Sequence, residues 1–107
     1  MSLPLKRIID ERFIRKDGTC IIYIQYCYSS TNRTLLSTEI GIPPAYWDYK
    51  EGYIKRSLPP EYGSVEELNT GLRRMYRNAE DIVLFINKKN IPDPGAYAKS
   101  IFKTRNL

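Results

Sequence analysis

Residues 64–90, SVEELNTGLRRMYRNAEDIVLFINKKN, decide the fold because their apolar residues follow the period of an α-helix. The spacings of three and four place these residues along one stripe of a single long helix. The stripe consists of Val65, Leu68, Leu72, Met75, Tyr76, Ala79, Ile82, Val83 and Ile86. Ser64 and Glu67 have the spacing of a capping box, and Pro92 ends the pattern. Such a helix requires a second layer that covers its apolar stripe.

The residues before this helix alternate with a period of two and predict that second layer as three β-strands, at 8–16, 19–28 and 33–40. Asp17-Gly18 favours a two-residue type I′ hairpin turn between the first two strands. That turn would place Phe13 opposite Ile22. It would also leave Glu11 on the apolar side of the sheet, where we expect the first strand to fray or bulge.

Paired residues share a face of a sheet, so this register divides the strands into two faces. One face is apolar and collects Ile9, Phe13, Ile22, Ile24, Tyr26, Leu36, Thr38 and Ile40. The other face collects Arg12, Ile14, Lys16, Ile21, Tyr23, Gln25, Arg33, Leu35 and Ser37. The third strand agrees with this division only if an odd number of residues forms the second loop, which puts Leu36 opposite Ile24 and Thr38 opposite Ile22.

The predicted fold class is therefore α+β: a three-stranded antiparallel sheet, within residues 8–56, packed on one long C-terminal helix at 64–90. Two prolines exclude residues 41–48 from a central strand, and residues 52–56 suit a short extra strand. Asp93-Pro94 is typical of a helix start, and Tyr97, Ile101 and Phe102 would form the apolar side of a second short helix. We expect residues 1–91 to form one domain, and residues 92–107 to be a linker and the start of a following helical domain.

The composition bounds the function. Seventeen Lys and Arg against twelve Asp and Glu give a net charge of +5, which weakly favours polyanionic partners. The chain has no histidine, and its two cysteines, seven residues apart on one strand, are too far apart for a disulfide. We therefore expect no metal and no cofactor. With neither paired carboxylates nor an activated tyrosine, we also expect no catalysis and no small-molecule substrate. No apolar run resembles a membrane span or a signal peptide, so a cytoplasmic location is expected.

The candidate site is the polar face of the sheet, and its residues are Arg12, Lys16, Tyr23, Gln25, Arg33 and Ser37. Cations neutralise phosphates, while amide and hydroxyl groups can bond to base edges, so these residue types on one sheet suit the major groove of DNA. The alternative is a solvated face, because antiparallel sheets usually have one polar side.

Three stretches carry a resemblance to a known family: FIRKDG at 13–18, CIIYIQYCY at 20–28 and RTLLSTEIGIPPAYWDYKEGYIK at 33–55. They are similar to the N-terminal arm DNA-binding domain of tyrosine recombinases, most of all to integrases of Bacteroides-type conjugative elements and phages. The most distinctive match is the Pro-x-x-Trp-Asp segment formed by Pro44, Trp47 and Asp48. The chain departs from the family at Gln25, where a basic residue is common, and at Glu39, where glycine is common.

The resemblance implies three antiparallel strands backed by a helix, with the open face of the sheet in the major groove of arm-type sites. It implies partners of two kinds, double-stranded DNA and neighbouring recombinase protomers, and a place in DNA integration at the nucleoid. In the family the catalytic tyrosine, arginines, lysine and histidines belong to a separate domain. Trp47 is expected to be structural, packing the proline-rich segment onto the helix.

A second hypothesis is a protein-interaction module that assembles a recombinase complex. In that case the edge of the third strand or the exterior of the helix would dock on neighbouring protomers, since strand addition at an open edge is a common way to bind peptides. Removal of charge from the open face would then leave function intact, whereas disruption of the edge or of the helix exterior would abolish it.

Overall fold

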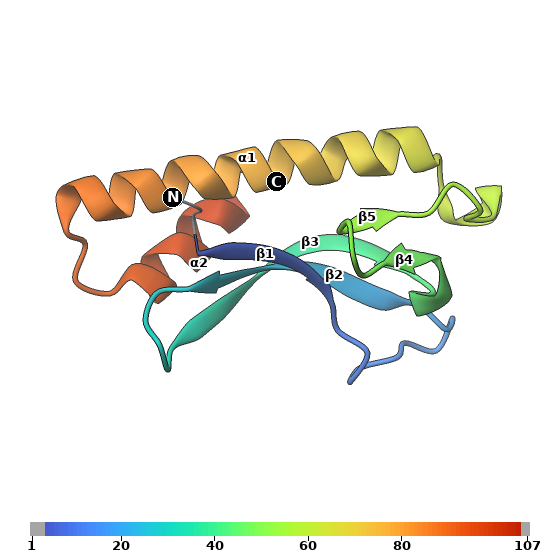
Figure 1. The fold of residues 1–107 in the computed structure, drawn as a ribbon, viewed down its shortest axis with the longest axis horizontal. Coiled ribbons are helices and arrows are strands. Elements are labelled where there is room, and N and C mark those ends of the chain that lie inside the picture. The colour runs from blue at the N-terminus through green and yellow to red at the C-terminus, as the bar shows by residue number, and fades with distance from the viewer. Residues whose placement is uncertain (1–3, 106–107) are drawn as a thin grey trace.

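The computed structural model describes residues 4–105, which form a three-stranded antiparallel sheet, a small hairpin and two helices (Figure 1). The sheet has the order β1-β2-β3, and its strands are β1 (Leu5–Ile9), β2 (Cys20–Cys27) and β3 (Arg33–Ile42). The remaining elements are β4 (Trp47–Asp48), β5 (Tyr53–Ile54), α1 (Val65–Lys89) and α2 (Pro94–Arg105). Short 3-10 turns at Pro44–Tyr46 and Pro60–Tyr62 precede β4 and α1. The α+β prediction is confirmed.

Helix α1 lies along one side of the sheet and covers its apolar face, as Figure 1 shows. The Ser64 side chain accepts a hydrogen bond from the backbone N–H of Glu67 at 3.4 Å, which satisfies one free donor of the first turn. Asn90 ends the helix in the left-handed conformation, at φ 52°. The predicted stripe is confirmed, because its central residues are buried: Leu72, Met75, Ala79, Ile82, Val83 and Ile86.

The pairing of β2 with β3 follows the prediction from Arg33 to Ser37, but the predicted pair of Thr38 with Ile22 is wrong, because β3 bulges there. Leu36 lies opposite Ile24, and Cys27 lies opposite Arg33, so residues 28–32 form a five-residue connection. An odd-numbered loop keeps the apolar residues of both strands on the side of α1.

The predicted register of the first strand is wrong. Ile9, four residues before Phe13, lies opposite Ile22. The predicted pairing would have buried the Glu11 carboxylate opposite Ile24, and an unpaired buried charge is costly. In the structure that position belongs to Arg7, whose guanidinium lies 4.7 Å from the ring centroid of Tyr53 and 4.6 Å from that of Tyr76. Cation–π contacts on both sides make Arg7 the better occupant.

The shift lengthens the connection between β1 and β2 to residues 10–19 and changes its turn. The backbone N–H of Gly18 donates to the carbonyl of Arg15 at 2.9 Å, and of residues 15–18 only Gly18 has a positive φ, at 81°. The predicted type I′ turn is therefore wrong, because it needs positive φ at both central residues. Asp17 instead accepts hydrogen bonds from the backbone N–H and the hydroxyl of Thr19, which stabilise a local turn.

Strand β3 is two residues longer than predicted and contains a bulge. Ile21 lies opposite Gly41 while Tyr23 lies opposite Ser37, so residues 38–40 together oppose a single residue of β2. Glu39 adopts the left-handed conformation there, at φ 61°. The bulge is held by Thr38, whose hydroxyl donates to the carbonyl of Ile22 at 2.7 Å.

The core consists of two clusters between the sheet and the helices. The hairpin-side cluster lies beneath β4 and β5 and includes Ile9, Cys20, Ile22, Ile42, Trp47, Ile54, Leu58 and Leu72. Trp47 is only 2% exposed, which confirms its structural role. Asn69 of α1 fixes the small hairpin, since its side-chain amide bonds to both the N–H and the carbonyl of Ile54. Cys20 and Cys27 are both free thiols, as expected.

The second short helix is confirmed as α2, and it shares the core of the sheet. Asp93 accepts a hydrogen bond from the N–H of Ala96 at 3.4 Å, so it caps the helix start. Ala98 and Phe102 are buried in the α2-side cluster, whose other members are Ile24, Tyr26, Leu36, Met75, Ala79, Ile82, Val83 and Ile86. The expectation that residues 92–107 lead into another domain stays a prediction, and residues 106–107 lie outside the described residues.

Within residues 4–105, neither helix combines the length and the apolar character needed to cross a membrane.

Candidate nucleic-acid interface

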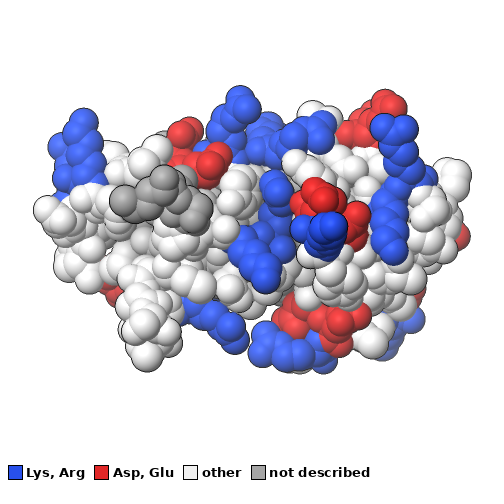
Figure 2. All heavy atoms as spheres, in the orientation of Figure 1, with Lys and Arg blue, Asp and Glu red and all other residues white. Residues whose placement is uncertain are grey.

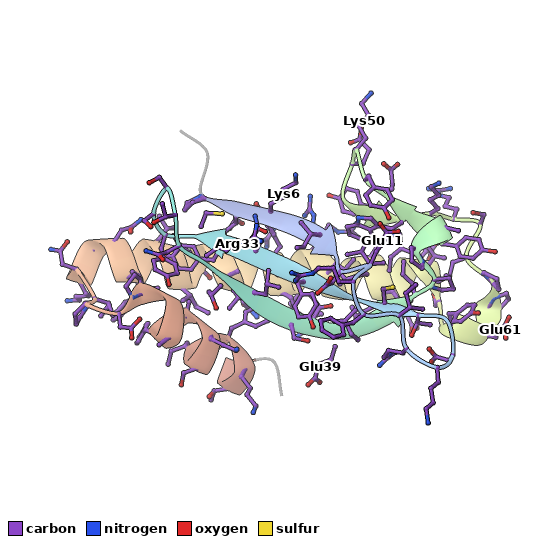
Figure 3. The ribbon with its side chains drawn as sticks, turned by 90° about the horizontal axis from the view of Figure 1, so that it is seen from below. Lys6, Glu11, Arg33, Glu39, Lys50 and Glu61 are labelled. Atoms are coloured by element: carbon purple, nitrogen blue, oxygen red, sulfur yellow. The ribbon has the colours of Figure 1, made fainter. Side chains whose placement is uncertain are left out.

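The face of the sheet that points away from α1 carries the candidate site, and no helix or hairpin of the described residues covers it (Figure 3). Four predicted residues lie on this open face: Tyr23, Gln25, Arg33 and Ser37. Tyr23 lies directly opposite Ser37, and Gln25 lies opposite Leu35. Arg33 and Ser37 are exposed, while Tyr23 and Gln25 are half-buried by their neighbours on adjacent strands. Tyrosine, serine, amide and guanidinium groups therefore share one surface.

Gln25 is oriented by its two neighbours on this surface. Arg33 donates to its side-chain oxygen over 3.5 Å, and the Gln25 NH2 group donates to the Cys27 sulfur at 3.4 Å. Glutamine reads adenine by offering a donor and an acceptor together. In the free protein the side-chain oxygen of Gln25 already accepts this hydrogen bond from Arg33. A ligand would therefore contact Gln25 and Arg33 together.

Arg12 joins this surface from the connection after β1 rather than from a strand. Its guanidinium donates to both carboxylate oxygens of Asp10, at 2.9 and 3.1 Å. The side chain of Arg12 is 69% exposed, whereas that of Asp10 is only 9% exposed. This hydrogen bond holds the pKa of Asp10 below its usual value and raises the pKa of Arg12. Arg12 is thus fixed in place, with much of its charge balanced.

Lys16 does not join the surface. It lies in the exposed turn between β1 and β2, because β1 ends at Ile9 instead of reaching the turn. Lys6 takes its place: it is exposed on β1 and lies opposite Gln25. Lys6 was not among the predicted site residues, although the strand alternation from Leu5 to Ile9 would have placed it on this face.

Two depressions adjoin the open face. The open-face hollow has a volume of about 730 Å³ and is lined by Ile8, Ile9, Asp10, Glu11, Arg12, Gln25, Arg33 and Leu35. The β3–α2 groove has a volume of about 660 Å³ and runs between β3 and the second helix. Its cations are Arg12, Arg33, Lys99 and Lys103, and Tyr23 and Ser37 supply hydroxyl groups. Asp10, Arg12, Arg33 and Leu35 line both depressions, so the two form one continuous surface.

On the side of the molecule seen in Figure 2, charge is distributed rather than concentrated. Figure 2 shows Lys and Arg side chains interleaved with Asp and Glu over the face seen there. Figure 3 places Glu11 and Glu39 beside the open face, on which Arg33 also lies. Local geometry, more than the net charge of +5, must therefore determine where a polyanion binds.

The described residues show no metal cluster at this surface, since among residues 4–105 no group of three or more His, Cys, Asp or Glu side chains could hold a metal ion. Burial raises the pKa of the Cys20 thiol and of the Tyr26 and Tyr76 hydroxyls, which pack in or against the core rather than on this surface. Comparison with protein families, curated proteins and solved structures finds no match to this chain.

Proposed function

We propose that the chain binds double-stranded DNA through the open face of its sheet. The observation that carries the proposal is the uncovered row of Tyr23, Gln25, Arg33 and Ser37 on adjacent strands. Guanidinium groups bond to guanine or phosphate, and amides bond to adenine, so this set contains groups for both positioning and base reading.

The dimensions of the sheet suit this role. In a three-stranded sheet with strands about 4.8 Å apart, the axes of the outer strands lie about 10 Å apart. The major groove of B-DNA is about 12 Å wide and admits a two-stranded β-ribbon, so two neighbouring strands of this sheet match it. The bulge at Glu39 adds twist to β3, and a twisted ribbon follows the curve of a groove better than a flat one.

We further propose that the module belongs to a tyrosine recombinase and binds its arm-type sites, without catalysis of its own. The resemblance around Pro44, Trp47 and Asp48 is the support for this step, together with a fold of three strands backed by a long helix. Neighbouring recombinase protomers would be its protein partners, and the nucleoid in the cytoplasm its place of action.

The test starts with selection of bound duplexes from a randomised pool, followed by fluorescence-anisotropy titration of the enriched duplex and of a scrambled copy. We expect Arg33→Ala to weaken binding to both duplexes. Gln25→Ala should cost about 1–3 kcal/mol on the enriched duplex and little on the scrambled one. Arg74→Ala, an equal loss of charge on the exposed side of α1, is the control. Equal effects of Arg33→Ala and Arg74→Ala, or no binding at low salt, would contradict the proposal.

Protein interaction is the second candidate, and the exterior of α1 favours it. Leu84 and Phe85 are 55% and 45% exposed, and the Phe85 ring stacks on Tyr97 with centroids 6.1 Å apart. Exposed apolar side chains that gather on one surface often mark an interface. If neighbouring protomers dock there, Leu84→Ser with Phe85→Ser should reduce self-association in sedimentation velocity and leave DNA affinity unchanged. Loss of DNA binding in that variant would instead tie the surface to the DNA site.

A further inference from the structure

We propose that α2 is a phosphate clamp, in which Lys99 and Lys103 hold the sugar–phosphate backbone that passes the outer edge of β3. The inference rests on the proposed function and extends it to an element outside the sheet. It assigns to the β3–α2 groove one ligand chemistry, the phosphodiester backbone of duplex DNA.

The geometry of the groove presents both lysines toward the edge strand. Residues 33–39 of β3, seven in a row, line one wall, and within residues 4–105 β3 has a neighbouring strand on one side only. Lys99 and Lys103 line the other wall. They are four residues apart, so they lie on the same side of the helix, about 6 Å apart along its axis. Phe102, buried in the core, anchors the helix between them.

The charges of the groove favour an anion. Four cations and two carboxylates, those of Asp10 and Glu39, line it. Asp10 is engaged by Arg12 through two side-chain hydrogen bonds, so its charge is balanced locally. Lysine holds phosphate as a point charge that needs no fixed orientation, which suits contacts that do not read sequence.

The position of the groove matches the path of a DNA strand. The axes of the outer strands lie about 10 Å apart, close to the groove width of about 12 Å, so the edges of a sheet seated on the groove face the sugar–phosphate backbones. The groove begins where the open-face hollow ends, since both share Arg12, Arg33 and Leu35. A duplex seated on the open face would therefore bring one backbone over α2.

An acidic peptide that adds as a strand to the free edge of β3 is the competing occupant of the same groove. The continuity of the groove with the open face favours DNA, because Tyr23 and Ser37 line the groove and also belong to the open-face surface.

The experiment compares two double variants of the whole chain, each lacking two lysine charges: Lys99→Ala with Lys103→Ala, and Lys88→Ala with Lys89→Ala. All four side chains are exposed, so both variants should keep the thermal midpoint of the unsubstituted protein. DNA affinity is measured against salt concentration for the enriched duplex and for its scrambled copy. Each lost phosphate contact lowers the log–log slope by about 0.9. We expect the first variant to lower the slope by about 2 on both duplexes, and the second by less than half as much.

The outcomes are distinguishable from failure of the proposed function. If the unsubstituted protein binds no duplex, both proposals fall. If it binds but the two double variants have equal slopes, the clamp alone falls. A labelled polyglutamate peptide is the third arm: if Lys99→Ala with Lys103→Ala abolishes peptide binding and leaves the duplex slope unchanged, the groove belongs to an acidic protein segment, and the clamp is overturned.

Discussion

The carboxylate of Asp10 accepts three hydrogen bonds from Arg12, two from its guanidinium and one from its backbone N–H at 3.0 Å. Asp10 directly follows β1, so this pair fixes the start of the connection to β2. It also places a cation over the open-face hollow while balancing its charge. Arg12 and Arg33, which both line that hollow, are therefore not equivalent toward a polyanion.

The first prediction follows from that balance. Asp10→Asn should strengthen DNA binding, because the charge of Arg12 is no longer balanced and becomes available to a phosphate. The log–log salt slope should then steepen by up to about 0.9, the contribution of one phosphate contact. Asparagine keeps an acceptor for the Arg12 backbone, so the turn should remain folded. Anisotropy titration at several salt concentrations measures the effect, and Asp81→Asn on the exposed side of α1 is the matched control. Weaker binding by Asp10→Asn than by Asp81→Asn would contradict the prediction.

The second prediction concerns pH. The hydrogen bond from the Arg12 side chain is the main cause of the lowered pKa of Asp10, so the folded state favours its charged form. The stabilisation is therefore present above the unfolded-state pKa and is lost as the pH falls through the lower folded-state value. Thermal unfolding followed by circular dichroism should show a falling midpoint over this acidic range. Arg12→Ala should flatten that fall, and an unchanged profile would exclude the pair as its source.

The third prediction concerns the bulge in β3. Glu39 is held at φ 61°, a conformation that costs residues with a Cβ about 1 kcal/mol and costs glycine almost nothing. Glu39→Gly relieves this strain and should raise the free energy of unfolding by up to about 1 kcal/mol. The gain is reduced by the greater conformational entropy of glycine in the unfolded chain, which favours unfolding. Glu39→Ala removes the same charge but keeps the strain, so it is the control. If both variants had equal stability in chemical denaturation, the strain would be absent.

The fourth prediction concerns Trp47, which is buried in the hairpin-side cluster. Trp47→Ala should lower the free energy of unfolding by about 3–5 kcal/mol, because the side chain leaves a large cavity. Trp47→Phe refills most of that space and should cost clearly less. Chemical denaturation followed by circular dichroism compares the two. A similar loss for both variants would mean that the indole N–H, rather than its volume, matters at this position.

The parts of the fold that could be predicted from sequence depend on local rules. The period of α1 and the cap at Ser64 involve residues within a few turns of each other, and both were confirmed. The register of β2 with β3 also followed from Arg33 to Ser37, because one face of each strand is buried and a one-residue slip would expose Ile24 and Leu36 together. The bulge after Ser37 was not predicted.

The first strand could not be predicted in the same way, because its register depends on residues far away in the chain. Arg7 can face the helix layer only because Tyr53 and Tyr76 lie on either side of it. Those two tyrosines belong to β5 and α1, and no residue near Arg7 in the sequence predicts their contact with it. Asp-Gly at the turn was a misleading local signal, since Asp17 bonds to Thr19 instead of adopting a positive φ.

The candidate site, like the fold, could be predicted only where local strand alternation determines it. Tyr23, Gln25, Arg33 and Ser37 were placed correctly on the open face, because strand alternation alone assigns them to one side. Lys16 was misplaced, since its position required a first strand that reaches the turn. Lys99 and Lys103 were not predicted as site residues, because only the packing of α2 against the sheet brings them to β3.

The position of Phe102, between the two groove lysines and inside the core, makes the same helix serve packing and binding. Under the proposed clamp, DNA binds only the folded state. By mass action, the thermal stability of the protein therefore rises with the concentration of DNA. Undocking of α2 would remove the two lysine contacts with the duplex and at the same time uncover Leu36 to water. The unbound protein would thus be the form most exposed to aggregation and proteolysis, and occupancy of its sites would prolong its lifetime.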